Sequence, residues 1–394
     1  MYLTREQEKM LNGEYGWATA KAIELIIRVG EALGADRLIQ VKHAHVSGVS
    51  YSNIGKYGLE FIVDFYKRGG RARVYTTINP GCIDYSGFST IIDNKYMSEQ
   101  KVIDDALIGM GFKPVFTCIP YYYRPPVQGE HLAWGESSAV IYANSIYGAL
   151  TNREGGPIAL AASITGYTYN AGLHLLENRV GRIIVKLDPV VKNTPMGAIG
   201  LFIGDVVKKT PVLHGLENID FSELKILLAS MAASGSHALA IIPGITPENT
   251  YRVEVEEELT IEKQDLEKYM GESLDLKHKS TSSVLGYLGC PHLHPLELLQ
   301  IVELIRKYGR VRRGSLLLTL PPEYLDKYSF LINELRARGV DIAAGTCPVV
   351  SVFKKKYDYV LTNSGKAAFY LRRIHGLKTI ITSLREVIRY ICGY

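Results

Sequence analysis

Three of the five cysteines in this 394-residue chain share a sequence setting that suits metal chemistry. Cys118, Cys290 and Cys347 each follow a short apolar run, and each lies one or two residues before a proline. A disulfide uses two sulfur atoms, and a closed structural zinc site or electron-transfer cluster normally uses four protein ligands. Three thiolates therefore indicate a metal site that keeps one coordination position open for chemistry.

The prolines strengthen this interpretation, because a proline fixes its own φ and pushes the preceding residue out of the helical region. Such a loop can hold a ligand in one conformation ahead of a helix, whose N-terminus favours a thiolate. Two alternatives stay open on the residues alone. The cysteines could be buried structural side chains, or a zinc site could use His292 or His294. Cys82 and Cys392 are less informative.

Four segments rich in glycine or hydroxyl groups offer N–H and O–H donors to an anion: residues 46–51, 79–82, 135–138 and 363–366. In the last of them, Lys366 lies in the first turn of an expected helix, where a cation opposes the helix dipole unless an anion binds there. Each segment has an ordinary alternative: a plain turn for the first two, an N-cap serine for the third and an exposed lysine for the fourth. In the polar corner 151–156, Arg153 and Glu154 could pair with each other or face a substrate.

The order of apolar and polar runs predicts an α/β fold in which parallel sheets are flanked by helices. The expected strands are 38–42, 73–78, 114–117, 158–163, 182–187, 238–242, 315–320, 357–362 and 379–382. The expected helices are 17–33, 137–150, 221–234, 295–308, 323–338 and 383–390, with a loop at 43–48. Ligands of parallel sheets lie beyond the carboxyl ends of the strands, so we expect the three cysteines at that edge.

Composition and charge argue against several other classes of protein. The formal net charge is +5, and 47% hydrophobic with 22% charged residues is typical of a globular enzyme. The basic residues are spread out, which argues against a nucleic-acid-binding face. A capping box from Thr4 to Gln7 begins a charged helix rather than a signal peptide, and no apolar run reaches the roughly 18 residues of a membrane span. We expect a cytoplasmic location, and we interpret the charge-rich residues 253–280 as a surface excursion or a lobe boundary.

Taken together, these segments resemble the aconitase X family over essentially the whole chain, residues 1–392. The matching phrases begin at Asn79, Cys118, Gly135, Thr151, Gly289, Cys347 and Asn363. Any one phrase would be weak, but their order along the chain makes the resemblance specific. It implies an aconitase-like α/β fold with parallel sheets flanked by helices in two or three lobes around a central cluster cleft. The lobes are expected at 1–155, 156–285 and 286–394.

The resemblance also implies a hydro-lyase whose [4Fe-4S] cluster is held by Cys118, Cys290 and Cys347. The fourth iron lacks a thiolate and would bind the substrate hydroxyl and carboxylate, which assists a poor leaving group. The most similar branch of the family is implied to dehydrate (R)-5-phosphomevalonate to trans-anhydromevalonate 5-phosphate in an archaeal mevalonate pathway. The family's substrate-binding positions correspond to Gly48, Val49, Ser50, Asn79, Pro80, Ser137, Ser138 and Lys366.

A protein partner is implied as well, because aconitases close the site with a mobile domain whose serine abstracts the proton. No such domain is evident in this sequence, so the resemblance implies a heterodimer with a small subunit that supplies the swivelling domain and the catalytic serine. Two alternatives stay open. One is a hydroxyproline dehydratase of the same family, although Lys366 and the serine loops favour a substrate with an anionic tail. The other is a non-catalytic iron–sulfur sensor or electron carrier, which the missing fourth cysteine and the even charge distribution disfavour.

Overall fold

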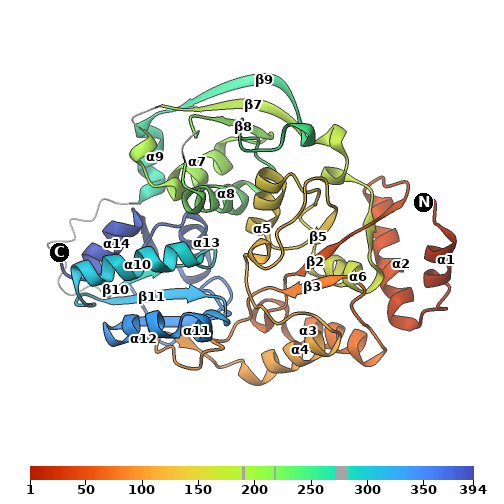
Figure 1. Cartoon of the computed structure of the whole chain (residues 1–394), viewed down its shortest axis with the longest axis horizontal. Coiled ribbons are helices and arrows are strands. Elements are labelled where there is room, and N and C mark those ends of the chain that lie inside the picture. Colours follow the sequence, from red (N-terminus) through yellow and green to blue (C-terminus); the bar gives the residue numbers. More distant parts are fainter. Residues whose placement is uncertain (189–190, 217–218, 272–282) are drawn as a thin grey trace. The chain divides into compact units, whose positions relative to one another are not determined.

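The computed structural model describes residues 1–188, 191–216, 219–271 and 283–394, without the side chain of Lys192. The chain forms two compact units, and each is described by itself. Unit 1 comprises Met1–Cys82, Tyr96–Gly181 and Ala238–Glu254, and unit 2 comprises Ile83–Lys95, Arg182–His237 and Val255–Tyr394. Each unit contains parallel strands packed against helices (Figure 1), so the predicted α/β class is confirmed.

A three-stranded parallel sheet forms the centre of unit 1, in the order β3-β2-β5. Its strands are β2 (His43–Val46), β3 (Tyr75–Ile78) and β5 (Leu132–Trp134). All four residues of β2 are buried, as expected for a central parallel strand. Helix α6 (Gly156–Thr165) packs against β2 and β5, and α2 (Trp17–Ala32) packs against α6. Because both strand pairs are parallel, the loops that follow the three strands begin at the same edge of the sheet.

Further helices and a strand pair complete unit 1. They are α1 (Arg5–Leu11), α3 (Tyr51–Lys67), α4 (Met97–Gly109), α5 (Ser137–Tyr142) and the antiparallel strands β1 (Leu38–Gln40) and β6 (Tyr167–Tyr169). Short 3-10 helices cover Pro120–Tyr122, Gly172–His174, Leu176–Asn178 and Glu248–Thr250. The predicted capping box begins α1, because the Gln7 N–H donates to Thr4 Oγ1 and the Thr4 N–H donates to the Gln7 side chain.

A five-stranded parallel sheet forms the centre of unit 2, in the order β12-β11-β10-β14-β15. The strands are β10 (Val284–Leu288), β11 (Ser315–Leu320), β12 (Val340–Ala344), β14 (Tyr359–Thr362) and β15 (Lys378–Ile381). Its helices are α10 (Pro295–Tyr308), α11 (Tyr324–Lys327), α12 (Ser329–Ala337), α13 (Gly365–His375) and α14 (Leu384–Ile391). Helix α14 packs against β10, α12 against β12 and α13 against β15. Nearly every residue of β10 and β11 is buried, which explains their continuous apolar runs.

A pair of closely packed helices, α7 (Met196–Val206) and α8 (Phe221–Gly235), lies against α13 in the same unit. Glycines permit this approach. A Cβ atom on Gly204 would lie 2.1 Å from Ser234 Oγ, and one on Gly197 would lie 2.4 Å from the carbonyl oxygen of Asn363. The apolar, glycine-rich stretch at 196–203 is therefore a packing helix. Within the described residues, no helix combines the length and apolarity needed to cross a membrane.

A smaller sheet in the order β8-β7-β9 contains β7 (Val180–Leu187), β8 (Pro211–His214) and β9 (Arg252–Ile261). Strand β9 is exposed along most of its length, and its glutamates form ion pairs with basic residues of β7 and with Lys209. Helix α9 (Lys263–Met270) follows, and β4 (Ile92–Asp93) pairs with β13 (Val352–Phe353). The expected surface excursion is thus an exposed strand and a helix, and its part at 272–282 lies outside the described residues.

Several expected elements are wrong in type. Residues 158–163 belong to helix α6, which begins with proline in its first turn and is buried on all sides, so its sequence lacks helical periodicity. Residues 43–46 of the expected loop form β2. Residues 114–117 and 238–242 form no strand; the first segment only runs beside β3, through a bridge between Lys113 and Thr77.

The expected helix at 137–150 is shorter than predicted. Helix α5 ends at Tyr142, a π-helical turn covers Ala143–Tyr147, and Gly148 ends it with a φ of +63°. The side chain of Asn144 donates to the carbonyl oxygens of Thr151 and Ala238, and it accepts from the Thr151 N–H. These side-chain contacts replace the regular continuation of the helix.

Candidate active site

The carboxyl edge of the unit 1 sheet gathers seven of the eight predicted substrate-binding residues. Strands β2 and β3 are parallel, and so are β2 and β5, so the loops that follow them leave the sheet at one edge. These residues are Gly48, Val49 and Ser50 after β2, Asn79 and Pro80 after β3, and Ser137 and Ser138 at the start of α5. We call this set the unit 1 edge. The structure thus brings together donors from three segments that are far apart in the sequence.

Glycines allow the loops of the unit 1 edge to approach one another. Gly48 has a φ of +68°, which an L side chain rarely adopts. A Cβ atom on Gly135 would lie 2.3 Å from Ser47 Oγ, and one on Gly156 would lie 2.5 Å from the Ser47 carbonyl oxygen. The loop after β2 therefore packs tightly against the loop after β5 and against the start of α6.

The carboxylate of Glu136 connects two of these loops. It accepts hydrogen bonds from Asn79 Nδ2 (3.2 Å), from Ser138 Oγ (3.0 Å) and from the Ser138 N–H (3.3 Å). Glu136 is also the N-cap of α5, so the alternative of an N-cap serine in this segment is wrong. Ser137 and Ser138 lie in the first turn, as the sequence predicts.

Two buried histidines of β2 lie behind Asn79. His45 Nε2 lies 3.1 Å from Asn79 Oδ1, and the Thr77 hydroxyl lies 2.8 Å from His45 Nδ1 and 2.9 Å from His43 Nε2. Burial lowers the pKa of His45 from 6.5 to about 4, although its hydrogen bond to Asn79 opposes the shift. Burial also lowers the pKa of His43. Both rings are therefore neutral near pH 7.

Cys118 belongs to unit 1 and lies at the end of the segment that runs beside β3. The N–H of Thr117 donates to the Ile78 carbonyl oxygen (3.1 Å), which places Cys118 next to the carboxyl end of β3. Phe116 has a φ of +40°, a left-handed conformation that costs a bulky residue about 1–3 kcal/mol. Cys118 is 7% exposed, so the strained turn holds a buried thiol at this edge.

The carboxyl edge of the unit 2 sheet holds the other predicted residues. Cys290 follows β10, Cys347 follows β12 and Lys366 follows β14, and all three strands belong to one parallel sheet. His292 Nε2 lies 2.9 Å from the Thr346 carbonyl oxygen, which connects the two cysteine loops. We call Cys290, Cys347 and Lys366 the unit 2 edge. The prediction that these cysteines follow the carboxyl ends of parallel strands is confirmed.

A buried ion pair supports the loop of Cys290. Lys225 of α8 contacts the carboxylate of Glu297, and it also donates to the His292 carbonyl oxygen (2.9 Å). The two side chains are 5% and 4% exposed. A charge pair with this little solvent needs additional hydrogen bonds to offset its desolvation, and the loop carbonyl supplies one of them.

Lys366 is buried in the first turn of α13, with 6% of its surface exposed. The N-cap Ser364 accepts from the Ala367 N–H (3.0 Å), and Gly365 packs so closely on α7 that a Cβ would lie 2.1 Å from the Gly197 carbonyl oxygen. The alternative of an exposed lysine is therefore wrong. A buried ammonium group at a helix N-terminus favours a nearby anion.

The predicted metal ligands are divided between the units, with Cys118 in unit 1 and Cys290 and Cys347 in unit 2. No group of three or more His, Cys, Asp or Glu side chains in the described part of the chain is arranged as a metal site. Even so, their donor chemistry fits a thiophilic group, because all three are thiols: Cys290 and Cys347 follow parallel strands, and Cys118 lies next to the carboxyl end of β3. Cys82 differs, because its thiol donates to Gln100 Oε1 (3.2 Å).

Comparison with family models places the whole fold in one family. The models "Aconitase X first domain", "Aconitase X second domain" and "Aconitase X third domain" match residues 1–177, 181–271 and 284–393. The chain belongs to the aconitase X family. The resemblance predicted from the sequence is therefore confirmed.

Relatives and a solved structure agree with this assignment. The phosphomevalonate dehydratase large subunits of Thermococcus kodakarensis and Methanosarcina mazei are 41% and 36% identical to this aconitase X chain. The matches cover 94% of this chain and 95% of the first relative, and 100% of this chain and 98% of the second. A crystal structure of Thermococcus kodakaraensis aconitase X in its holo-form superposes with a TM-score of 0.90 at 38% identity, over 99% of this chain and 100% of that one.

A more distant relative acts on another substrate. The cis-3-hydroxy-L-proline dehydratase of Hypocrea jecorina is 27% identical over 100% of this chain and 69% of its own length. The family thus includes dehydratases with different names, and membership alone does not choose between their substrates.

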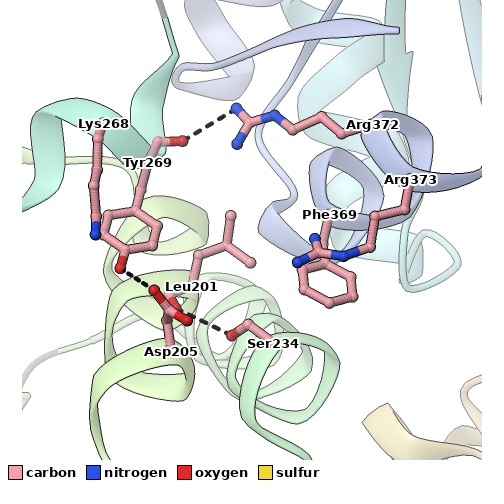
Figure 2. Close-up of a pocket in the computed structure, with 8 residues that line it drawn as sticks. All are labelled: Leu201, Asp205, Ser234, Lys268, Tyr269, Phe369, Arg372 and Arg373. Atoms are coloured by element: carbon pink, nitrogen blue, oxygen red, sulfur yellow. Dashed lines mark hydrogen bonds between the residues drawn. The ribbon is translucent and has the colours of Figure 1, made fainter. Parts of the chain in front are cut away.

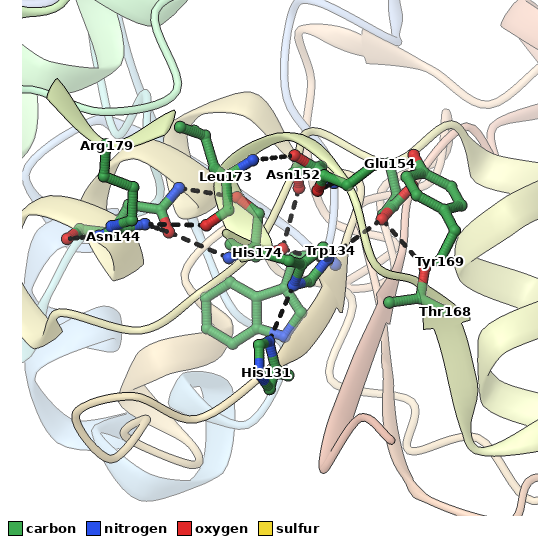
Figure 3. Close-up of polar contacts among 12 residues, drawn as sticks. His131, Trp134, Asn144, Asn152, Glu154, Thr168, Tyr169, Leu173, His174 and Arg179 are labelled. Carbon is green, nitrogen blue, oxygen red and sulfur yellow. Dashed lines mark hydrogen bonds and ion pairs between the residues drawn. The ribbon is translucent and has the colours of Figure 1, made fainter. Parts of the chain in front are cut away.

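The polar corner 151–156 has a structural role in this aconitase X chain (Figure 3). Glu154 is buried and accepts hydrogen bonds from Tyr169 Oη (2.6 Å) and Thr168 Oγ1 (3.2 Å), with His174 Nε2 3.7 Å away. The exposed Arg153 has no ion pair with it in the described residues. The predicted pair between Arg153 and Glu154 is therefore wrong, and a contact of either residue with a substrate stays a prediction.

A separate pocket of about 200 Å³ lies within unit 2, and its lining includes none of the predicted site residues (Figure 2). It is lined by Leu201, Asp205, Ser234, Lys268, Tyr269, Phe369, Arg372 and Arg373. Arg372 donates to the carbonyl oxygens of Thr379 (3.0 Å) and Tyr269 (3.4 Å), and Asp205 accepts from Tyr269 Oη (2.5 Å). These contacts join α7, α9 and α13 and account for much of the polar lining.

Sequence reasoning missed Glu136, His45 and Thr77, whose hydrogen bonds support the unit 1 edge. The signal for His45 was present: His43 and His45 alternate in a short run, and alternate residues of a strand face the same side. The run was assigned to a loop, which hid that periodicity. For Glu136, the sequence offered one indication: this residue precedes an expected helix, and carboxylates are common at helix N-termini.

Proposed function

We propose that this chain is the large subunit of a hydro-lyase that dehydrates (R)-5-phosphomevalonate to trans-anhydromevalonate 5-phosphate. The observation that carries this proposal is the near-complete match to chains named phosphomevalonate dehydratase large subunit, at 33–41% identity. The two site edges supply the donors that such a substrate needs, because a phosphate and a carboxylate together offer many acceptor oxygens.

Cys118, Cys290 and Cys347 would hold a [4Fe-4S] cluster in this proposal. Three thiols leave one iron without a protein ligand, in contrast to a cluster that only transfers electrons. When bound, such a cluster supplies a Lewis-acidic iron that stabilises a departing hydroxide. The holo-form of the related structure is consistent with a bound cofactor in the family.

The chain's own residues bind and orient the anionic substrate. Lys366 provides a buried positive charge at the start of α13. Ser137 and Ser138 provide hydroxyls and first-turn N–H groups, and Gly48, Val49 and Ser50 provide the loop before α3. Asn79 and Pro80 complete the set at the end of β3. Apart from the exposed Gly48, these residues are buried, which limits the access of water and strengthens each charge-assisted hydrogen bond to the ligand.

A small subunit would complete the enzyme. The relatives are named large subunits, which supports a second chain as partner. In this proposal the small subunit contributes the swivelling domain and a serine that acts as the general base. We also propose a cytoplasmic location, as predicted from the sequence.

Dehydration of a hydroxyproline is the second candidate, and the relative from Hypocrea jecorina motivates it. A hydroxyproline carries a ring ammonium in place of the phosphate, so its site needs an acceptor where phosphomevalonate needs donors. The buried Lys366 favours the phosphorylated substrate, because an ammonium beside it would be repelled.

The deciding experiment is an anaerobic assay of this chain with its small subunit, using phosphomevalonate and a panel of hydroxyprolines. We expect turnover of phosphomevalonate only. Cys118→Ser should remove both activity and iron, whereas Cys82→Ser should keep both, since Cys82 lies outside the proposed ligand set. Turnover of a hydroxyproline in preference to phosphomevalonate would refute the substrate assignment.

A further inference from the structure

Four hydrogen bonds in series lie beneath the unit 1 edge. They join His43 Nε2 to Thr77 Oγ1 (2.9 Å), Thr77 Oγ1 to His45 Nδ1 (2.8 Å), His45 Nε2 to Asn79 Oδ1 (3.1 Å), and Asn79 Nδ2 to Glu136 Oε2 (3.2 Å). We call this series the His45 chain. His43, Thr77 and His45 are 0% exposed and Asn79 is 8% exposed, so water does not compete for these groups.

The direction of every bond in the His45 chain follows from the carboxylate at its end. A carboxylate accepts hydrogen bonds and donates none, so the atom of Asn79 that faces Glu136 is the amide nitrogen. The amide oxygen of Asn79 then faces His45. Because that oxygen also only accepts, His45 must donate from Nε2.

The same logic continues to the far end of the chain. A neutral His45 with its proton on Nε2 has a bare Nδ1, so the Thr77 hydroxyl donates to Nδ1. A hydroxyl has one proton, so Thr77 accepts from His43 Nε2–H. This leaves His43 Nδ1 as a bare acceptor, and within the described residues that nitrogen has no hydrogen-bond partner. A buried acceptor without a partner is tolerated better than a buried N–H without one.

The orientation of Asn79 has a consequence for ligands. One Nδ2 proton of Asn79 is used by Glu136, and the second has no acceptor among the residues that the structure describes. Asn79 lies at the carboxyl end of β3, within the unit 1 edge. The free proton is therefore available to an oxygen atom of a bound molecule.

We propose that His45 is a positioning residue, which through the His45 chain fixes the Asn79 amide so that it offers a ligand an N–H donor. The inference deepens the proposed function, on which its substrate class rests. The site matches an oxyanion, such as a phosphate or carboxylate oxygen, at this position. A ring ammonium would need an acceptor there, so the fixed amide discriminates against it.

The first test measures the tautomer of His45 by ¹H–¹⁵N correlation spectra of the labelled wild-type chain, with the signals assigned from their loss in His45→Gln. We expect a neutral ring protonated on Nε2 at pH 7. Thr77→Ser keeps a hydroxyl and should preserve the spectrum, whereas Thr77→Val removes it and should shift the ring signals. A ring protonated on Nδ1 alone would overturn the proposal, whatever the enzyme turns over.

The second test separates positioning from a merely structural role. With phosphomevalonate and the small subunit, Thr77→Val should raise KM roughly tenfold, the effect of one lost hydrogen bond, with a smaller change in kcat. Thr77→Ser should stay within about twofold of wild type. Equal kinetics for the two variants, with both folded, would refute positioning. If Thr77→Val does not fold, His45→Gln, whose amide can still donate, is compared with His45→Met instead.

A third measurement keeps the inference testable if the wild-type enzyme does not dehydrate phosphomevalonate. The Asn79 side-chain NH₂ signals, assigned from Asn79→Ala, are followed while inorganic phosphate or pyrrolidine, a ring ammonium without a carboxylate, is added. Shifts with phosphate but not with pyrrolidine support the donor orientation independently of the reaction. Shifts with pyrrolidine alone would contradict it.

Discussion

The two site edges occupy the same topological position in their sheets but hold ligand-binding groups in different ways. The unit 1 edge presents neutral donors, which are oriented by hydrogen bonds to one another and to Glu136. The unit 2 edge presents thiols and an ammonium group, and a buried ion pair supports one of its loops. The carboxyl edge of a parallel sheet can therefore supply orientation in one unit and charge in the other.

The largest expected effect tests whether the two edges serve one cofactor. Cys118→Ser in unit 1 and Cys290→Ser or Cys347→Ser in unit 2 should each lower activity more than about 1,000-fold, because a cluster that loses a thiolate ligand also loses the open iron. The check is iron content, visible absorption and turnover under anaerobic conditions. Cys392→Ser is the control in unit 2. If substitutions in only one unit cause a loss of iron, the cysteines of the two units do not hold the same cofactor.

Removal of the ion pair beneath the unit 2 edge should destabilise the fold. Lys225→Met leaves Glu297 as an isolated buried carboxylate, so we expect the free energy of unfolding to fall by about 3–5 kcal/mol. Denaturant unfolding measures the loss. The double variant Lys225→Met/Glu297→Leu should recover part of it. Arg306→Ala breaks a pair with Glu334 that solvent screens, and it should destabilise the fold much less than Lys225→Met does. If Lys225→Met and Arg306→Ala lowered the free energy of unfolding by similar amounts, the Lys225–Glu297 pair would not be buried as the structure shows.

Acid should destabilise the unit 1 edge through His45, because burial lowers its pKa from the ordinary value of 6.5 to about 4 in the folded chain. Below pH 6.5 the unfolded chain binds a proton that the folded chain does not, so stability falls as pH decreases from about 6.5 to 4. One such group contributes a slope of about 1.4 kcal/mol per pH unit within that window. The free energy of unfolding, measured across this pH range, should depend less on pH in His45→Gln than in the wild-type chain. The exposed His214→Gln serves as control and should keep the wild-type slope.

The smallest of these effects concerns the charge in the unit 2 edge. Lys366→Met keeps the apolar stem but removes the ammonium group, so KM for phosphomevalonate should rise roughly 10- to 100-fold with a smaller change in kcat. Lys378→Met, an exposed lysine at the start of β15, should leave both constants unchanged. A fall in kcat alone, without a change in KM, would place Lys366 in the chemical step and not in substrate binding.

The sequence predicted much of unit 2 because its strands are separated by regular helices. The apolar run of β11 and the periodic helix α10 match their expected ranges, since each has a clear start and end signal in the sequence. Unit 1 was less predictable. Helix α6 is buried on all sides and lacks an amphipathic pattern. Strand β2 contains two histidines, which are polar residues, and hydrogen bonds to Thr77 and Asn79 from a neighbouring segment allow them to be buried.

The residue types of the site and their places near strand ends could be predicted from local sequence, because periodicity, proline and glycine mark many strand and helix boundaries. The contacts of Asn79 with Glu136 and His45, and the burial of Lys366, depend on how distant segments pack. The order of strands in a sheet is set by packing between distant segments, so contacts across loops cannot be read from spacing along the chain. Amide orientation and burial follow from those contacts, and they decide which atoms a ligand meets.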